Sequence, residues 1–205
     1  MSSRDAWDAT FIPGTDVLAN KLGLTDGAAL REVEYRLGAV RQQRIADGRI
    51  AVNRTFDAAH LHAIHRALFF PIYDWAGVVR TYPLSKDGMR FAEPGEIDRY
   101  LDRARRAIAQ TDWTDRDLDA FAARAADVFA SINMAHPYRE GNGRASKLFM
   151  SQLAERAGFA LDYSRVTPEQ WNNASMFSRP DRGTFEPVPD TLVPVFARIS
   201  RRPPT

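Results

Sequence analysis

Nine residues, HPYREGNGR at 136–144, join two apolar runs that both have helical spacing. Pro137 ends the first helix because its ring cannot continue the hydrogen-bond ladder, and it restricts the backbone of His136 as well. The loop has more polar and charged side chains than a simple connecting turn requires. It contains a histidine, a carboxylate, two arginines and an asparagine, together with two glycines. The pattern predicts two helices that hold a functional loop between them.

Helical spacing of apolar residues continues along most of the chain and predicts an all-α fold. One break occurs where Asp87-Gly88 separates two short runs, which predicts a small β-hairpin at about 81–92. At 205 residues the chain suits one domain. The expected helices cover 28–47, 55–69 after a Thr55 cap, 96–109, 115–134, 144–157, a segment that starts after Thr167, and 189–199.

The start of the helix after Thr167 has the clearest local signature. In VTPEQW, Thr167 is an N-cap, Pro168 takes the first helical position, and Gln170 completes a capping box. The first 27 residues are turn-rich and predict an extended arm with one short helical piece.

Composition excludes several classes of protein. The 44% hydrophobic content supports a packed core, and the absence of cysteine excludes disulfide frameworks and cysteine-based zinc or redox chemistry. No apolar run is long enough to span a membrane. The net charge of +2 gives no reason to expect direct nucleic-acid binding. We expect a cytoplasmic protein, located in the bacterial cytosol or in a host cytosol after delivery.

The loop residues fit a metal–nucleotide phosphate site. His136 can act as a general base, although a histidine that caps a helix C-terminus is the commoner role for one alone. Gly141 and Gly143 let backbone N–H groups converge as an anion nest, and Arg144 can grip a phosphate with two parallel bonds. Glu140 has no place beside an anion unless it holds a cation such as Mg²⁺. A plain glycine-rich turn explains the glycines but leaves His136, Glu140 and Arg144 without a reason.

These residues resemble a known family. HPYREGNGRASK is similar to the Fic signature HPFx(D/E)GNGRxxR, and IHRALFFPIYDWAGVVR at 64–80 resembles the segment that leads into the family's hairpin flap. VTPEQWNNAS resembles the helix after the signature helix. The resemblance covers roughly 55–197. It implies an N-terminal arm and helix at 1–54 packed on the core, an all-α Fic catalytic core at 55–197, and a frayed tail at 198–205.

The resemblance implies transfer of AMP from ATP to a Ser, Thr or Tyr hydroxyl of a target protein. His136 would deprotonate that hydroxyl, and Glu140 would hold Mg²⁺ on the α- and β-phosphates. The nucleotide would bind to Arg139, Gly141, Asn142, Gly143, Arg144 and Lys147. The flap would dock the target backbone as a strand through Pro83, Leu84, Ser85, Lys86, Met89 and Phe91.

Two residues depart from the family pattern. Tyr138 replaces a phenylalanine, which is tolerable if its hydroxyl finds a partner. Lys147 replaces the second arginine. It keeps the positive charge that would meet the terminal phosphate, but it lacks the guanidinium that donates two parallel hydrogen bonds. Lys147 therefore leaves open the transfer of another phosphate-containing group. A third interpretation is a catalytically silent binding protein with a Fic fold. The presence of His136, Glu140 and Arg144 disfavours it.

Regulation and metal binding complete the sequence-based expectations. The chain contains no (S/T)xxxE(G/N) inhibitory string, and SQLAER at 151–156 ends on Arg156. This is typical of family members whose inhibitory glutamate comes from a separate small antitoxin, and the alternative is a member without such inhibition. His60, His62 and His65 cluster within HLHAIH, but the spacing of His60 and His62 puts them on different helix faces. We therefore expect no metal site there, and expect His65 in the core.

Overall fold

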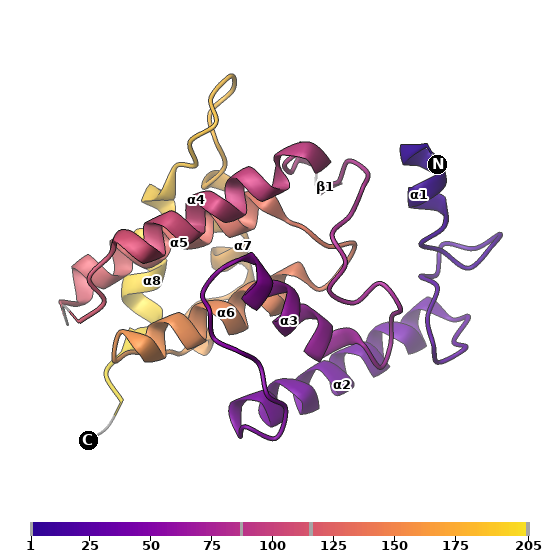
Figure 1. Ribbon diagram of the computed structural model, residues 1–205, viewed down its shortest axis with the longest axis horizontal. Helices are drawn as coiled ribbons and strands as arrows, with labels where there is room; N and C mark the ends of the chain where they lie inside the picture. The colour runs from indigo at the N-terminus through magenta and orange to yellow at the C-terminus, as the bar shows by residue number, and fades with distance from the viewer. Residues whose placement is uncertain (1, 87, 115–116, 204–205) are drawn as a thin grey trace.

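The chain forms a bundle of α-helices in the computed structural model, which describes residues 2–86, 88–114 and 117–203. The all-α prediction is confirmed. Figure 1 shows how the helices are arranged. The described α-helices are α1 (Ser3–Asp8), α2 (Gly27–Ala46), α3 (Ala58–Phe69), α4 (Ile97–Gln110), α5 (Leu118–Ala135), α6 (Asn142–Arg156), α7 (Pro168–Phe177) and α8 (Val193–Ile199). Short 3-10 turns cover Pro94–Glu96, Tyr163–Arg165 and Pro189–Thr191.

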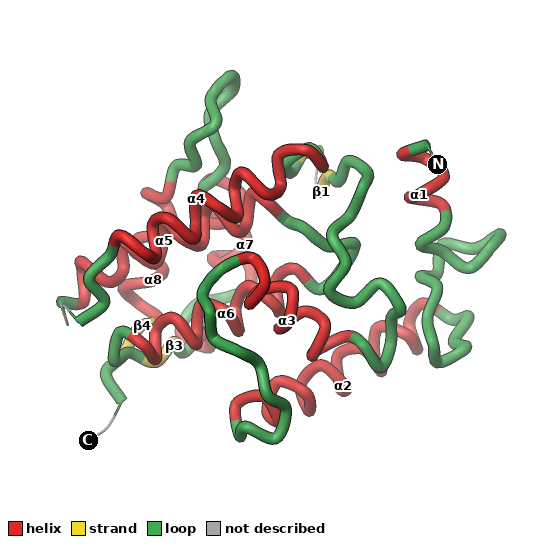
Figure 2. The backbone as a smooth tube through the Cα atoms, in the orientation of Figure 1, coloured by secondary structure: helices red, strands yellow, loops and turns green. Residues whose placement is uncertain are grey.

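Two small antiparallel sheets, yellow in Figure 2, accompany the helices. Strand β1 (Ser85–Lys86) pairs with β2 (Met89–Arg90), which confirms the predicted hairpin but limits its ladder to these four residues. Asp87 of the predicted turn lies outside the described residues. The second sheet, β3 (Ala160–Leu161) with β4 (Ser200–Arg201), was not predicted, because its strands are two residues long and far apart in sequence.

Helix α5 lies at the centre of the bundle. It packs against α4, α6 and α8, while α3 packs against α6 on one side and α2 on the other. Most residues of α5 are buried, and many of these are alanines, including Ala122, Ala125 and Ala126. A helix that is apolar nearly all round belongs inside a bundle, and small side chains let its neighbours approach closely. The ends of α5 and α6 thus hold the 136–144 loop against the core of the bundle, where Tyr138 is fully buried.

Local capping chemistry fixes where the helices begin. The Thr167 capping box is confirmed, since Thr167 Oγ1 accepts from Gln170 N at 3.1 Å and Gln170 Oε1 accepts from Thr167 N at 2.9 Å. The predicted Thr55 cap is wrong. Asp57 caps α3 by accepting from His60 N at 3.0 Å, and Thr55 donates to Asp57 at 2.6 Å instead.

Two further boundaries differ from the sequence-based expectation. Helix α6 begins at Asn142, two residues before the expected position, because Gly141 serves as its N-cap. Helix α5 was expected from residue 115, but 115–116 lie outside the described residues. Its first described turn starts at Leu118, where Asp117 accepts from Ala120 N at 2.8 Å.

The C-terminal segment is held more firmly than a frayed tail from residue 198 would be. Ile199 is fully buried, and Ser200 is 3% exposed. Asp162 N donates to Ile199 O at 2.8 Å, and Arg201 pairs with Ala160. The expectation of fraying is therefore wrong for 198–201.

The N-terminal arm packs beside the loop region rather than extending into solvent. Trp7 packs edge-on against Tyr82 at 5.3 Å between ring centroids, and Lys21 N donates to Ile72 O at 2.8 Å.

Among the residues that the structure describes, no helix has the length and apolar character needed to cross a membrane.

Candidate active site

The loop between α5 and α6 has a backbone shape that few residue types adopt. His136 ends α5 in the left-handed region, with φ of 40°, and Gly141 begins α6 with φ of 80°. Positive φ costs a non-glycine residue on the order of 1 kcal/mol, and such strain gathers at functional sites. At Gly141 even a methyl group would lie 2.4 Å from the Phe69 ring. Only glycine fits there.

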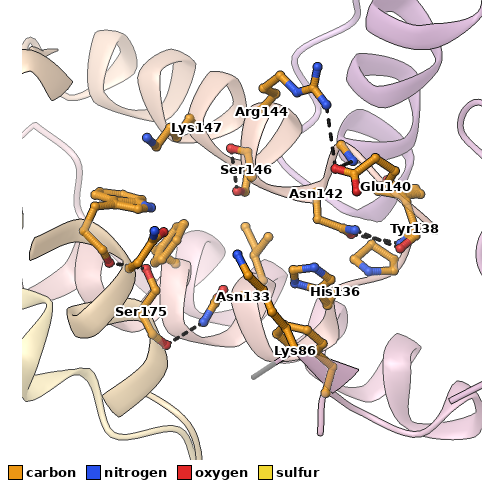
Figure 3. A pocket seen from close by; sticks show the side chains of 18 of the residues that line it. Lys86, Asn133, His136, Tyr138, Glu140, Asn142, Arg144, Ser146, Lys147 and Ser175 are labelled. Atoms are coloured by element: carbon orange, nitrogen blue, oxygen red, sulfur yellow. Dashed lines mark hydrogen bonds and ion pairs between the residues drawn. The ribbon is translucent and has the colours of Figure 1, made fainter. Parts of the chain in front are cut away.

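A cavity of about 510 Å³ opens at this loop and is walled by α5, α6, α7 and the hairpin. Figure 3 shows His136, Asn133 and Lys86 on one side, and Ser146 and Lys147 of α6 on the other. Of the residues predicted for the site, the cavity brings together His136, Arg139, Glu140, Gly141, Asn142, Gly143, Arg144, Lys147, Lys86 and Phe91. It does not include Pro83, Leu84, Ser85 or Met89.

The His136 ring lies flat against a ring from the hairpin. Phe91 stacks on it with 3.6 Å between ring centroids and 12° between ring planes. Burial, and then the nearby cations Arg80, Arg179 and Lys86, lower the pKa of His136 to about 3. The ring is therefore neutral at physiological pH, with a nitrogen lone pair able to accept a proton.

Arg80, for which the sequence suggested no role, joins the hairpin to the loop. Arg80 is 4% exposed, and among the described residues its guanidinium donates to backbone carbonyls. Burial lowers the pKa of Arg80. Its own N–H donates to Pro137 O at 2.8 Å. The carbonyl acceptors are His136 at 2.9 Å, Tyr82 at 2.7 Å, Ala92 at 2.6 Å and Ala135 at 3.3 Å.

The first turn of α6 contains the residues predicted to form an anion nest. Gly141 N donates to Glu140 Oε1 at 2.8 Å, so this amide faces the carboxylate that lies half-exposed at the cavity. The Asn142 side chain instead closes the loop, accepting from Tyr138 N at 2.9 Å and donating to Tyr138 O at 2.8 Å. What Asn142 can offer a ligand is therefore its backbone N–H.

Tyr138, the departure from the phenylalanine of the pattern, is fully buried with its hydroxyl satisfied. His62 Nδ1 lies 2.7 Å from the hydroxyl oxygen, which meets the condition set by the sequence. The Tyr138 ring also stacks on His65 at 3.7 Å between centroids. The loop is thus anchored on α3.

Arg144 is oriented by contacts that the sequence did not indicate. Its Nη2 donates to the buried carboxylate of Glu34 on α2, and Glu34 also accepts from the Tyr73 hydroxyl. Arg144 Nη2 lies 3.7 Å from Glu140 Oε1, and the guanidinium packs over the Phe69 ring at 4.6 Å. One nitrogen is engaged by Glu34, which leaves others for a ligand.

Lys147 lies one turn further along α6 and points at aromatic rings. Its Nζ is 4.7 Å from the Trp171 ring centroid and 4.9 Å from that of Tyr163. Burial lowers the pKa of Lys147. Cation–π contact stabilises the ammonium without a carboxylate, and the described residues include no acidic side chain within 4.0 Å of it.

Arg139 is held by the N-terminal arm. Its Nε donates to Thr10 Oγ1 at 3.1 Å, and its guanidinium lies 4.0 Å from the Trp7 ring and 4.9 Å from the Phe11 ring. Burial lowers the pKa of Arg139. The arm therefore helps to shape the cavity wall.

The hairpin presents an exposed tip and a buried root. Ser85, Lys86 and Met89 are exposed, while Phe91 is 5% exposed and donates its N–H to Leu84 O at 3.0 Å. The predicted flap residues thus divide into two that line the cavity and four that face outward or pack beside it.

The histidine cluster on α3 spreads its rings to separate partners. His60 Nε2 lies 2.7 Å from Gln152 Oε1, His62 contacts Tyr138, and His65 Nε2 lies 2.8 Å from Glu140 O. Among the described residues no group of three histidine, cysteine or acidic side chains is placed to hold a metal ion.

Several cavity residues were not found from the sequence. They come from α5, α6 and α7 and the segment after α7, and most are small polar or aromatic side chains without a motif. The sequence signal nearest to them is the resemblance of VTPEQWNNAS at 166–175 to the helix after the signature helix. These residues are Asn133, Ser146, Trp171, Asn172, Asn173, Ser175, Met176 and Arg179.

Comparison with known proteins gives a consistent family assignment. The Fic/DOC family model matches residues 55–154. The chain is 34% identical over 174 residues to the probable protein adenylyltransferase y4lH of Sinorhizobium fredii, across 83% of this chain and 88% of y4lH. It is 36% identical over 168 residues to protein adenylyltransferase VbhT of Bartonella schoenbuchensis, across 81% of this chain but only 34% of VbhT.

A solved structure agrees with the sequence relatives. BepC, a VirB-translocated effector of Bartonella tribocorum with bound AMPPNP, superimposes with a TM-score of 0.81 and 26% identity, across 96% of this chain and 98% of BepC. Together with the matched signature loop, these similarities show that the chain belongs to the Fic/DOC family.

Proposed function

We propose that the protein is an adenylyltransferase that moves AMP from ATP to a Ser, Thr or Tyr hydroxyl of a target protein. The observation that carries the proposal is that His136, Glu140, Gly141 and Arg144 line one cavity. Its volume of about 510 Å³ suits a nucleotide. The names of the relatives y4lH and VbhT and the AMPPNP bound to BepC support the same activity.

In the proposed complex the phosphates lie against the first turn of α6. The backbone N–H groups of 141–143 and the positive end of the helix attract the α- and β-phosphates. Arg144 and Arg139 add charge at the rim, and Lys147 reaches the terminal phosphate. Aromatic and amide side chains of α7 remain for the nucleoside, among them Trp171 and Asn172.

Glu140 is the residue that would hold Mg²⁺. Its carboxylate is half-exposed at the cavity beside the anion nest. One carboxylate together with substrate phosphates is a usual ligand set for Mg²⁺, which keeps several waters, so the donor set fits. When bound, Mg²⁺ neutralises phosphate charge during transfer.

His136 would act as the general base. The target hydroxyl oxygen attacks the α-phosphorus, the bond to the β-phosphate bridging oxygen breaks, and pyrophosphate leaves. The hydroxyl proton passes to a nitrogen of the neutral His136 ring. The pKa of His136, lowered to about 3 by burial and neighbouring cations, keeps the ring unprotonated before each turnover.

The hairpin would position the target. The exposed edges of β1 and β2 can pair with an extended target segment through backbone hydrogen bonds. Arg80 ties the hairpin root to the carbonyl of His136 at 2.9 Å. A segment docked on the hairpin would therefore lie at a fixed distance from the base.

The test uses cell lysate, Mg²⁺ and ATP labelled at either the α- or the γ-phosphate, with His136→Ala as control. Transfer of α-label that requires His136 supports adenylylation. Transfer of γ-label would identify a phosphotransferase, the alternative that Lys147 keeps open. No transfer from either label, with wild type equal to His136→Ala, contradicts ATP-dependent transfer and favours a silent binding protein or a different donor.

A small antitoxin protein is the proposed regulatory partner, supplying an inhibitory glutamate in trans. The motif (S/T)xxxE(G/N) is absent from the sequence, and Lys147 offers such a glutamate a cationic partner. The proposed site of action is cytosolic, either in the bacterium or in a host. Expression of wild type and His136→Ala chains in a bacterial cytosol tests the idea: wild type should arrest growth unless the partner is co-expressed, and harmless wild type would contradict it.

A further inference from the structure

His65 makes two hydrogen bonds that define the position of its proton. The side chain is fully buried on α3, with 0% exposure. The backbone N–H of Gly77 donates to His65 Nδ1 at 2.8 Å. A neutral imidazole has one acceptor and one donor nitrogen, so the proton is on Nε2. That nitrogen lies 2.8 Å from the carbonyl oxygen of Glu140 and donates to it.

The bond to Glu140 determines which way one peptide unit of the signature loop faces. The chain has no cis peptide bond among the described residues. In a trans peptide the carbonyl and the following N–H point in opposite directions. Because the Glu140 carbonyl points at His65 on α3, the Gly141 N–H points away from α3. It meets the Glu140 carboxylate at 2.8 Å on the cavity side.

The same helix face supports the loop at three levels. His62, His65 and Phe69 follow one another along a face of α3 at spacings of three and four residues. His62 contacts the Tyr138 hydroxyl, His65 stacks under the Tyr138 ring, and Phe69 fills the space where Gly141 lacks a side chain. Within this support, the one hydrogen bond from α3 to the 140–141 peptide comes from His65.

We propose that His65 is a positioning residue for the anion nest: it holds the 140–141 peptide so that the Gly141 N–H faces the cavity and donates to a phosphate oxygen of the nucleotide. The inference rests on the proposed nucleotide site.

The chain contains a matched control on the same helix. His60 is 1% exposed, accepts from Phe56 N at Nδ1 at 3.3 Å, and contacts Gln152 Oε1 through Nε2 at 2.7 Å. It has the same two-sided bonding as His65, but none of its partners belongs to the signature loop. A general loss of core packing should therefore follow substitution of either histidine. A loss of nucleotide binding should follow only at His65.

Two amide variants separate the two hydrogen bonds of His65. The Gln amide nitrogen reaches roughly where Nε2 lies, so His65→Gln keeps a donor for Glu140 O. The shorter Asn side chain ends near the position of Nδ1, so His65→Asn can accept from Gly77 but does not reach Glu140. Both remove the buried ring, so thermal stability should fall similarly in the two.

The experiment measures the Kd of AMPPNP with Mg²⁺ by calorimetry and the melting temperature of each full-length variant. We expect His65→Asn to weaken binding about tenfold, in line with loss of one hydrogen bond to an ionised group. We expect His65→Gln to stay within about threefold of wild type. His60→Gln and His60→Asn should bind AMPPNP as wild type does. Equal Kd values for His65→Asn and His65→Gln would overturn the proposal, as would equal weakening by the His60 variants.

A nuclear magnetic resonance readout is independent of nucleotide binding and of catalysis. The ¹⁵N shifts of wild type should report an Nε2-protonated His65, and the Gly141 amide signal should move in His65→Asn but much less in His65→Gln. If wild type binds AMPPNP without transferring AMP, the proposed activity fails and the positioning role stands. If wild type does not bind AMPPNP, the proposed nucleotide site fails. An unmoved Gly141 amide in His65→Asn would refute the positioning role by itself.

Discussion

Glu34 and Arg144 form an ion pair that joins the N-terminal helix α2 to the signature helix α6 at the edge of the cavity. Glu34 is 7% exposed and also accepts from the Tyr73 hydroxyl. Burial, followed by this bond, raises the pKa of Tyr73, so Tyr73 stays a donor to Glu34. A segment outside the matched family region thus orients a residue of the proposed phosphate site.

The ion pair predicts a stability difference between two glutamates of α2. Glu34→Ala leaves Arg144 and the Tyr73 hydroxyl without their shared acceptor and should lower the free energy of unfolding by about 2–4 kcal/mol, the lower part of this range reflecting the partial exposure of Arg144. Glu32→Ala breaks an exposed pair with Arg36 and should cost less than about 1 kcal/mol. Urea unfolding measures both.

A double-mutant cycle isolates the pair itself. The Glu34→Ala and Arg144→Ala changes should be non-additive by more than about 1 kcal/mol, since each removes the other's partner. Strict additivity would show that Glu34 stabilises the fold through Tyr73 and packing alone.

The environment of His136 predicts the pH dependence of transfer. Its folded pKa is lowered to about 3, so the neutral form needed for base catalysis is present above that value and is lost as the pH falls through it. The acid limb of kcat/KM should therefore lie well below the ordinary histidine value of about 6.5. Initial rates between pH 4.5 and 8, on samples verified as folded, should therefore show no acid limb that belongs to His136.

Changing a neighbouring charge provides the control for this pH profile. Arg179 lowers the pKa of His136, so Arg179→Gln should move the acid limb toward higher pH. An acid limb at about 6.5 that does not respond to this substitution would mean that a group other than buried His136 limits the rate.

The position of Lys147 predicts that its substitution affects the binding of ATP more than the binding of ADP. If its ammonium leaves the rings of Trp171 and Tyr163 to meet the terminal phosphate, Lys147→Met should weaken ATP binding about tenfold, as loss of a charge-assisted bond does, and ADP binding far less. Lys147→Arg should tighten ATP binding, because the arginine guanidinium can donate to two phosphate oxygens at once. Calorimetric Kd values for both nucleotides decide it, and equal losses for ATP and ADP would place Lys147 elsewhere.

Alanine substitution at two glycines of the signature loop should change stability by very different amounts. Gly141→Ala combines a φ of 80° with a contact of 2.4 Å to Phe69. It should cost roughly 2 kcal/mol or more of stability and disturb the nest. Gly143→Ala meets no atom within 4 Å and lies in the first turn of α6, so its stability should change by less than about 1 kcal/mol. Melting temperatures, followed by Kd for AMPPNP, measure both effects.

The sequence predicted the parts of the fold that depend on local chemistry. The Thr167 capping box, the hairpin position around Asp87-Gly88, and the placement of the HPYREGNGR loop between two helices all follow from neighbours within a few residues. Thr55 failed as a cap because Asp57, two residues later, offers a stronger acceptor and takes the Thr55 hydroxyl as a donor.

The contacts that assemble the site are long-range and were not predictable in this way. Glu34 reaches Arg144 across 110 positions, and Arg80 donates to carbonyls on both flanks of the hairpin and at the start of the loop. Their sequence surroundings look like an ordinary helix face and an ordinary strand-like run. Only the folded chain shows that one is a partner for a site residue and the other a joint between two segments.

Arg80 has a consequence for how such a protein can diversify. Arg80 holds the root of the hairpin on the 136–144 loop through hydrogen bonds to backbone carbonyls, while Ser85 and Met89 at the hairpin tip are exposed and lie outside the cavity lining. Mutations at the tip can accumulate without shifting His136. Under the proposed docking role of the hairpin, target choice and reaction chemistry are then inherited as separable traits, and new targets can be acquired while the residues around His136 are conserved.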